Sequence, residues 1–481
     1  MQQAFLSRRT TIITIGLSAF LVGLGLARTN YLLPDSWVAL TVLLAVIGLL
    51  KKSYFSLIGI LLFGLALGWW RGETYLQKLR PYQQLTGQKV VLQVTAESDG
   101  VYENSQLSFD AGNIEIIKPF AQTVPGRIGV KGFGEAAVYR GDMVEVEGKL
   151  FMARGSRQAR TNFADLKVIG RSGSSLETVR LKFLAGVQNA LPEPLASFGL
   201  GLLIGQKTTL PEEVSRDLAI VGLTHIIAVS GYNLTIIIRA VQKFSGKRSK
   251  YQTLILSVLV IGVFLLVTGF SASIVRAAIV SMLSLLAWYY GRTFRPFLLL
   301  TLTAAITAGW YPLYLWSDIG WYLSFLAFYG VLILAPVLTK RICKDRQPNT
   351  LTLVITESLC AQAMTAPLIL FIFNQVSSIG LLSNLLIVPL VPLGMLLALY
   401  AGLGGMLWPI LAGWIAWPAR LLLTYMLDLV HIMAGWPHVL MERSLSLVSM
   451  LILYACLLVI TLVLWRKTLK TVKVTEIEIE E

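Results

Sequence analysis

The run TIITIGLSAFLVGLGLA, residues 11–27, contains no charged side chain and decides the class of this protein. A hydrocarbon core about 30 Å thick is crossed by a helix of about 20 apolar residues, so this run predicts a membrane-spanning helix. Similar runs recur along the chain, whose 481 residues are 55% hydrophobic and 14% charged, with a mean hydropathy of +0.69. This composition excludes a soluble globular protein and predicts a polytopic α-helical membrane protein.

The membrane helices are expected in two groups. Residues 11–27, 36–50 and 54–70 form the first, and residues 11–27 are not a cleaved signal, because the run is long and lacks a small-residue cleavage site. In total we expect about 12 transmembrane or re-entrant helices, give or take about two because helices between 199 and 242 are expected to be broken. The second group covers residues 251–268, 272–290, 296–310, 319–337, 351–373, 378–402, 408–430 and 447–465.

Basic loops orient these helices. Much of the net charge of +15 is orientation signal, since short loops keep Lys and Arg on the cytoplasmic side of a membrane. With the N-terminus and the C-terminus both in the cytoplasm, the basic segments of the chain all fall on that side. They are SRR at 7–9, KK at 51–52, KFSGKRSK at 243–250, GRTFR at 291–295, KRICKDR at 340–346 and RKTLKTVK at 466–473.

A less apolar insertion follows the third span and is expected outside the cytoplasm. Its hydrophobic period changes to two, which predicts strands. Five such strands favour a small closed barrel, and YRGDMVEVEGKL at 139–150 favours an OB-like one, with a tight turn at Gly141 and Asp142 and with Val144, Val146 and Leu150 facing inward. The five runs are KVVLQVTAES, QLSFDAGNIEII, GRIGVKGFGEA, GDMVEVEGKLFMA and ADLKVIGR.

The chain therefore divides into four segments. We expect a three-helix membrane segment at 1–70, an extracytoplasmic OB-like β domain at 71–173, a helical channel domain at 174–465 and a cytoplasmic tail at 466–481.

A polar kernel interrupts the apolar sequence of the helical domain in GLTHIIAVSGYNL, residues 222–234. His225 and Ser230 would lie about 140° apart on one helix, so they do not form a local Ser–His hydrolase pair. Gly231 can break the helix and free a carbonyl, which at membrane depth is tolerated only beside protein or a watery cavity. These residues and Asn233 are candidates for lining or gating a passage, with hydrogen bonding between helices as the structural alternative.

Three later stretches carry further polar candidates. Arg276 lies in GFSASIVRAAIVSML, and an ionisable group there is costly unless it reaches the interface or lines a cavity. Asp318, in WSDIGWYLSFLAF, lies just before the next span and is expected close to the outer end of the helix that carries Arg276. An Arg276–Asp318 pair is therefore the structural alternative to a role in a passage. Asn384 lies in LLSNLLIVPLVPLGML, where Pro389 and Pro392 predict a kinked or interrupted helix.

These four stretches, in this order and after a triple span with a β insertion, resemble the ComEC/Rec2 competence family over nearly the whole chain. The resemblance implies a channel in the bacterial cytoplasmic (inner) membrane that passes single-stranded DNA into the cytoplasm during natural transformation, and no enzyme activity. Many members of that family carry a C-terminal metallo-β-lactamase-like domain, and we expect this chain to lack one. The family's most recognisable signature is matched here by Gly222, Leu223, His225, Ala228, Ser230 and Gly231.

A DNA channel needs cations along the path, because phosphates cannot enter hydrocarbon. The cluster ARGSRQAR at 153–160 supplies Arg154, Arg157 and Arg160, beside Phe151 and Phe163, and is the candidate for receiving the strand by charge and base stacking. The alternative is a solvated loop with a few charges.

Other machinery is expected on separate proteins. No GxxxxGK[ST] motif occurs, so an ATPase or helicase would be a separate partner. We also expect an external DNA receptor and, where the second strand is degraded, a separate nuclease as partners. Three histidines, none in a zinc-nuclease arrangement, and three scattered cysteines predict neither a metal nor a cofactor. A small-solute or lipid transporter remains the alternative function. An intramembrane hydrolase pairing Ser230 with His431 is less favoured, because Asp428 is the simpler partner of that histidine.

Overall fold

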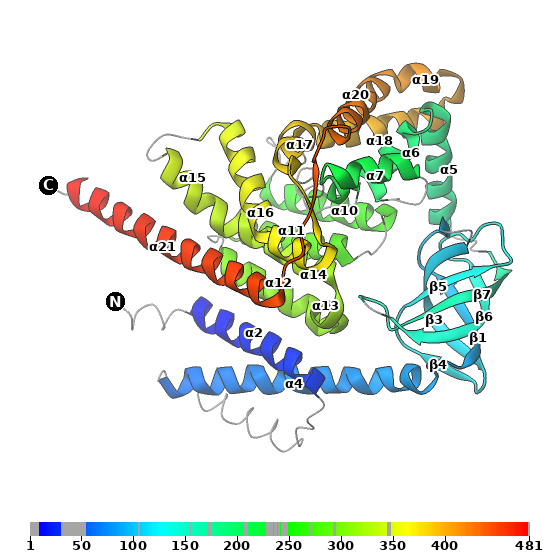
Figure 1. The fold of residues 1–481 in the computed structure, drawn as a ribbon, viewed down its shortest axis with the longest axis horizontal. Helices are drawn as coiled ribbons and strands as arrows, with labels where there is room; N and C mark the ends of the chain where they lie inside the picture. The colour runs from blue at the N-terminus through cyan, green and yellow to red at the C-terminus, as the bar shows by residue number, and fades with distance from the viewer. Residues whose placement is uncertain are drawn as a thin grey trace. The chain divides into compact units, whose positions relative to one another are not determined.

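Figure 1 shows the fold of the chain as a computed structural model. Its residues group into two compact units. The first comprises residues 1–182 and 293–321, and the second comprises residues 183–292 and 322–481. The described residues are 9–29, 54–103, 106–153, 155–171, 175–205, 210–227, 234, 238, 241, 249–268, 272–291, 295–343 and 348–479.

In the first unit, two N-terminal helices pack against each other along glycines. Helix α2 covers Arg9–Leu26 and helix α4 covers Tyr54–Gln84, which confirms helices at two of the three predicted N-terminal spans. A Cβ atom built on Gly23 would lie 2.0 Å from the carbonyl oxygen of Leu65, and one built on Gly68 would lie 2.0 Å from that of Phe20. Small residues let apolar helices approach until their backbones touch, which is the usual basis of helix association in lipid.

We predict that Gly68→Val separates α2 from α4 and destabilises the protein by about 1–3 kcal/mol, because the added side chain meets backbone. The matched control is Gly25→Val, since a Cβ on Gly25 has nothing within 4 Å. The stability of both variants is measured by thermal unfolding of the detergent-solubilised protein. Equal unfolding temperatures for the two variants would show that the close approach does not hold these helices together.

The β domain of the first unit contains the five strands that the alternating sequence predicts, and two short ones, β2 and β4, that it does not. Strand β7 starts earlier than its predicted run, which began at residue 164. The strands are β1 Lys89–Ala96, β2 Val101–Glu103, β3 Gln106–Lys118, β4 Gln122–Val124, β5 Ile128–Phe133, β6 Met143–Met152 and β7 Ala159–Gly170.

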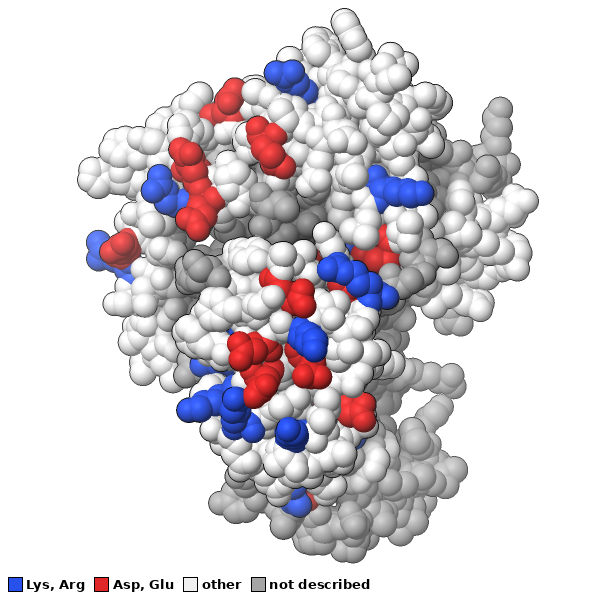
Figure 2. All heavy atoms as spheres, turned by 90° about the vertical axis from the view of Figure 1, so that its right-hand side faces the viewer, with Lys and Arg blue, Asp and Glu red and all other residues white. Residues whose placement is uncertain are grey.

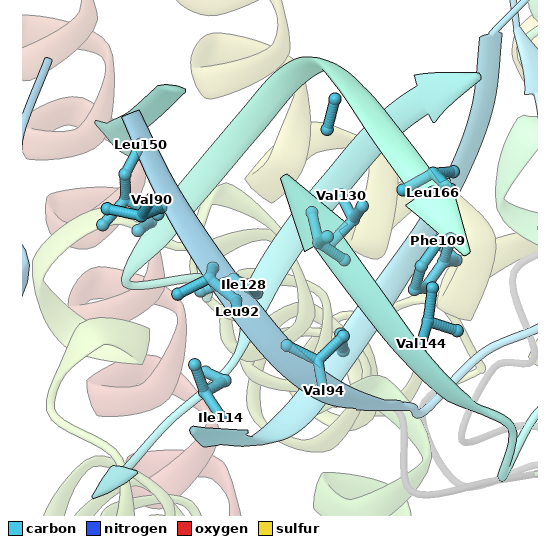
Figure 3. Packing of buried hydrophobic residues seen from close by; sticks show 14 of the residues in the cluster. Val90, Leu92, Val94, Phe109, Ile114, Ile128, Val130, Val144, Leu150 and Leu166 are labelled. Carbon is cyan, nitrogen blue, oxygen red and sulfur yellow. The ribbon is translucent and has the colours of Figure 1, made fainter. Parts of the chain in front are cut away.

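Each of the five long strands has a neighbour on both edges. The order is β1-β6-β7-β5-β3-β2, and β1 also pairs with β3, so the path of the sheet returns to its first strand. All pairs are antiparallel except β5 with β7. Val144, Val146 and Leu150 are buried, as their alternation predicts, and lie in a core of Val, Leu, Ile and Phe side chains (Figure 3).

The other helices of the first unit are short. Helix α12 covers Pro296–Trp310 and packs beside α2, and α13 covers Leu313–Ser317. Helix α5, Ser175–Ala190, and helix α14, Ile319–Tyr329, each cross a boundary between the units.

The second unit is helical, and its one small sheet pairs β8, Gln375–Ser377, with β9, Leu440–Glu442, within the described residues. Its first helices are α6 Leu195–Ile204, α7 Glu212–Ile220, α8 Thr224–Ile227, α10 Lys250–Thr268 and α11 Ala272–Tyr289. The later ones are η2 Gly330–Leu334, α15 Ala335–Cys343, α16 Thr350–Phe373, α17 Gly380–Ile387, η3 Val388–Leu390, α18 Val391–Leu407, η4 Pro409–Leu411, α19 Ala412–Ile415, α20 Trp417–Ala434 and α21 Leu447–Ile479.

The interrupted helix predicted around Asn384 is present. Between α17 and α18 the chain forms a single 3-10 turn, η3, with Pro389 in it and Pro392 at the start of α18. Proline removes a backbone donor and clashes with the preceding turn, which accounts for the break.

Among the described residues, four helical segments are long and apolar enough to cross a membrane, and a pair bent by 51° makes a fifth if it counts as one span. The four are Ile319–Cys343, Thr352–Phe373, Gly380–Leu407 and Leu447–Leu464, and the bent pair is Pro409–Ile415 with Trp417–Ala434. Five shorter apolar helices occur as well. The structure thus supports a polytopic membrane protein, while about 12 crossings stay a prediction, since the predicted span at 36–50 lies outside the described residues.

Candidate functional site: a basic aromatic face and a polar kernel

Two of the three candidate arginines of the β domain lie within the described residues, and their surroundings differ. Arg157 forms an ion pair with Asp110, with Nε 2.5 Å from Oδ1, which offsets its charge. Arg160 is exposed on β7 and has no ion pair among the residues that the structure describes. Arg154 lies outside those residues. Arg160 is therefore the better placed of the two to meet a phosphate.

Aromatic side chains accompany Arg160 on the outer face of the sheet. Phe151 on β6 is its direct partner in the antiparallel β6–β7 ladder. Phe163, further along β7, is 74% exposed and its ring centroid lies 6.3 Å from that of Phe133 at the end of β5. The sequence analysis missed Phe133, although the alternation that buries Val130 also turns Phe133 outward.

The loop that carries these arginines is fixed by Gln158, which is 3% exposed. Its Oε1 accepts a hydrogen bond of 2.6 Å from the backbone N–H of Arg127, and its Nε2 donates one of 2.7 Å to the hydroxyl of Tyr75 on α4. Burial raises the pKa of Tyr75 to about 12, so this hydroxyl stays protonated at neutral pH. The Ser317 hydroxyl also donates to the Gly155 carbonyl at 2.7 Å. The loop is thus tied to α4 and to α13.

Charges of both signs are interspersed on the face of the molecule shown in Figure 2. On the β domain several of them neutralise one another, for example Lys89 with Glu147 at 2.7 Å and Arg127 with Glu97 at 2.6 Å. Arg180 of α5 forms ion pairs with Asp99 and Glu177. On this face a polyanion would meet local groups of cations rather than a wide basic surface.

In the second unit, the described part of the polar kernel is a turn followed by α8. Gly222 has a φ of +79°, in the left-handed region that glycine adopts without strain. The side chain of His225 is exposed, and its Nδ1 lies 3.1 Å from the Gly222 carbonyl oxygen, which can only accept, so the contact favours the proton on Nδ1. Ser230, Gly231 and Asn233 lie outside the described residues.

The kernel meets the stretch that contains Asn384. The Ser383 hydroxyl donates a hydrogen bond of 2.7 Å to the Val221 carbonyl, and both groups are buried. A Cβ on Gly222 would lie 3.2 Å from the Ser377 side chain. The Oδ1 of Asn384 is buried and has no hydrogen-bond partner among the described residues. The structure thus brings two of the four polar stretches together, and Ser377 and Ser383 are contacts that sequence reasoning missed.

Arg276 and Asp318 are resolved in different units. Arg276 is only 2% exposed on α11, where a guanidinium is costly unless oxygen atoms surround it. The carboxylate of Asp318 accepts a hydrogen bond of 2.9 Å from the N–H of Gly320 and therefore caps the first turn of α14. The Arg276–Asp318 pair stays the structural alternative to a role of these residues in a passage.

The expected partner of His431 was wrong. Its Nδ1 lies 2.7 Å from Oδ2 of Asp217 on α7, rather than against Asp428 one turn earlier on its own helix. Packing of α7 against α20 brings the two residues together across the sequence. Ser230, the other half of the alternative hydrolase pair, lies outside the described residues. In the described part of the chain no group of three or more His, Cys, Asp or Glu side chains is arranged to hold a metal ion.

We predict that Ser383→Ala destabilises the protein by about 1–3 kcal/mol, because the buried Val221 carbonyl loses its donor. Ser284→Ala is the matched control, since that hydroxyl donates only to the Val280 carbonyl within its own helix. Thermal unfolding in detergent compares the stability of the two variants with that of the natural chain. If Ser284→Ala were the more damaging change, the Ser383 contact would not be what holds the kernel to α17.

The model of one protein family, described as Competence protein, matches residues 202–468. The matched region contains the polar kernel, Arg276, Asp318 and Asn384, and it excludes the β domain. No curated protein and no solved structure matches the chain.

Proposed function

The chain belongs to the competence protein family, whose role is in DNA uptake during transformation, and from this premise we propose that it is a membrane channel that conducts single-stranded DNA into the cytoplasm. The observation that carries the proposal is the meeting of the polar kernel with α17, the first part of a long apolar span whose α-helical hydrogen bonding is interrupted by the 3-10 turn η3. Irregular backbone at membrane depth is tolerated where it lines a cavity or is buried in protein.

The kernel and the helix α17–η3–α18 carry polar side chains of the kind that a hydrated passage needs. A polyanion requires a path that replaces its water, and polar side chains can hydrogen-bond phosphate and sugar oxygens. His225 and the buried Oδ1 of Asn384 lie on the two segments that the Ser383–Val221 hydrogen bond joins. We propose that these residues, with Ser230, Gly231, Asn233, Arg276 and Asp318, line or gate the passage.

The β domain receives the strand in this proposal. The pairing of β1 with both β6 and β3, and the single parallel pair β5–β7, support an OB-like barrel, a fold that binds oligonucleotides. We place it outside the cytoplasmic membrane, with both termini of the chain in the cytoplasm, on the distribution of Lys and Arg. Arg154, Arg157 and Arg160, with Phe151 and Phe163, are its proposed contacts.

Work on the strand is assigned to separate proteins. We infer a cytoplasmic ATPase or helicase, an external DNA receptor and, where the second strand is degraded, a nuclease. The alternative function is a small-solute or lipid transporter, which would also use polar groups beside an interrupted helix such as α17–η3–α18. Such a carrier does not require Arg160 and its aromatic neighbours on an external domain.

Uptake of labelled DNA into the cytoplasm tests the channel. Deleting the gene, or introducing His225→Ala or Arg276→Ala, is expected to lower internalised DNA at least about tenfold while DNA still binds outside, an effect of about 1.4 kcal/mol or more. His438→Ala and Arg420→Ala are matched controls, because both side chains are exposed and lie outside the four polar stretches that carry the proposed passage. Unimpaired internalisation without the gene would exclude the channel and turn attention to solute or lipid transport.

Arg160→Ala tests the receiving surface. We expect weaker DNA binding by the purified protein and a shallower dependence on salt, with the slope of log K against log salt reduced by about one, because one phosphate contact is lost. Arg80→Ala, an exposed arginine on α4, is the control. An unchanged salt slope in Arg160→Ala would show that phosphates do not contact this residue.

A further inference from the structure

The aromatic pair Phe133–Phe163 is exposed although both residues belong to strands, Phe133 at the end of β5 and Phe163 within β7. Phe133 is 43% exposed and Phe163 is 74% exposed, and their rings are tilted by 33° to each other. The neighbouring Val130 and Ala164 point into the core, so the two rings stand on the outer face of the sheet. Two exposed phenyl rings contribute little to folding, because their apolar surface stays in contact with solvent.

The backbone at Phe163 is strained as well. Its φ is +53°, a left-handed conformation that is unfavourable for a bulky side chain. The β5–β7 ladder pairs Val130 with Thr161 and then Gly132 with Ala164, so β7 holds one extra residue opposite Lys131. This is a bulge, and bulges redirect a side chain. The fold thus accepts strain at the residue whose ring is the more exposed of the pair, which is typical of functional positions.

Cations flank the pair on one side. Lys131 occupies the outward-facing side of β5 opposite the bulge, and Arg160 precedes Phe163 on β7 with Phe151 beside it. On the other side, Asp165 is the ladder partner of Phe133. This arrangement suits a ligand with flat apolar rings and with anionic groups on the Arg160 side. Nucleotides of a single strand have both features.

We propose, on the basis of the proposed function, that Phe133 and Phe163 form a base-stacking platform by which the β domain selects unpaired DNA over duplex DNA. In a duplex each base is covered on both faces by its neighbours, so only the phosphates are available to the protein. An unpaired base offers its face to an aromatic ring, and stacking of this kind does not depend on sequence. Arg160 contacts phosphate in both forms, whereas the rings contact only the single strand.

The test uses the full-length protein in nanodiscs and two probes, a labelled oligothymidylate of about 16 nucleotides and a duplex of the same length. Phe133→Ala and Phe163→Gly are each expected to weaken binding of the single strand about 5- to 150-fold, since stacking is worth about 1–3 kcal/mol per base, and to leave duplex binding unchanged. Ile169→Ala, which removes a 49% exposed side chain from β7, should change neither the affinity for the single strand nor that for the duplex.

Glycine at position 163 separates binding from folding. Because glycine adopts a positive φ without strain, Phe163→Gly should unfold at a temperature no lower than that of the natural chain while its single-strand affinity falls. Phe163→Trp should retain the affinity, because it retains an aromatic face. A fall in single-strand affinity that Phe163→Trp does not rescue would overturn the stacking role.

The outcomes also distinguish this inference from the proposed function. If the natural protein binds the single strand and the two ring variants bind it equally well, the platform is wrong and the channel is unaffected. If the natural protein binds neither probe, the β domain does not capture DNA, and the uptake assay still decides on the channel. If brominated lipids, rather than oligothymidylate, quench the added fluorescence of Phe163→Trp, the rings enter the bilayer and the platform is wrong.

Discussion

In hydrocarbon every backbone N–H and C=O group must find a partner inside the protein, and the architecture of this chain follows from that constraint. Helices meet it locally, which is why apolar runs such as Leu447–Leu464 form uninterrupted helices. Where the helix is broken, another group has to supply the bond. The buried Val221 carbonyl receives it from the Ser383 hydroxyl of α17, so a side chain maintains the backbone at the point where the polar kernel begins.

The same constraint explains where polar chemistry gathers. An irregular turn admits polar side chains, and the 3-10 turn η3 lies close to Asn384 while the turn at Gly222 lies close to His225. In water this constraint is relaxed, and in the β domain, which we propose lies outside the membrane, each long strand is paired on both edges. Its outer face is then free to display Arg160 and the aromatic rings. In the proposed mechanism the β domain receives the strand and the helical second unit passes it.

Much of this organisation could be predicted from the sequence, because hydrophobic period reports secondary structure directly. The alternating runs give the five long strands and the inward positions of Val144 and Val146, and Pro389 gives the broken helix. The ordered polar stretches give the competence family, which the family model confirms. The number of membrane crossings is harder to predict, since short apolar helices such as α6 satisfy the composition of a span without its length.

By itself, then, the sequence determined the class of protein, the β insertion and the segments that carry polar residues, because each depends on neighbours along the chain. Only the tertiary structure decided which distant residues meet. It assigned Asp217 rather than Asp428 to His431, Ser383 to the Val221 carbonyl and Phe133 to Phe163. Those pairings depend on how helices pack and on a one-residue bulge in a ladder, and neither leaves a periodic trace in the sequence.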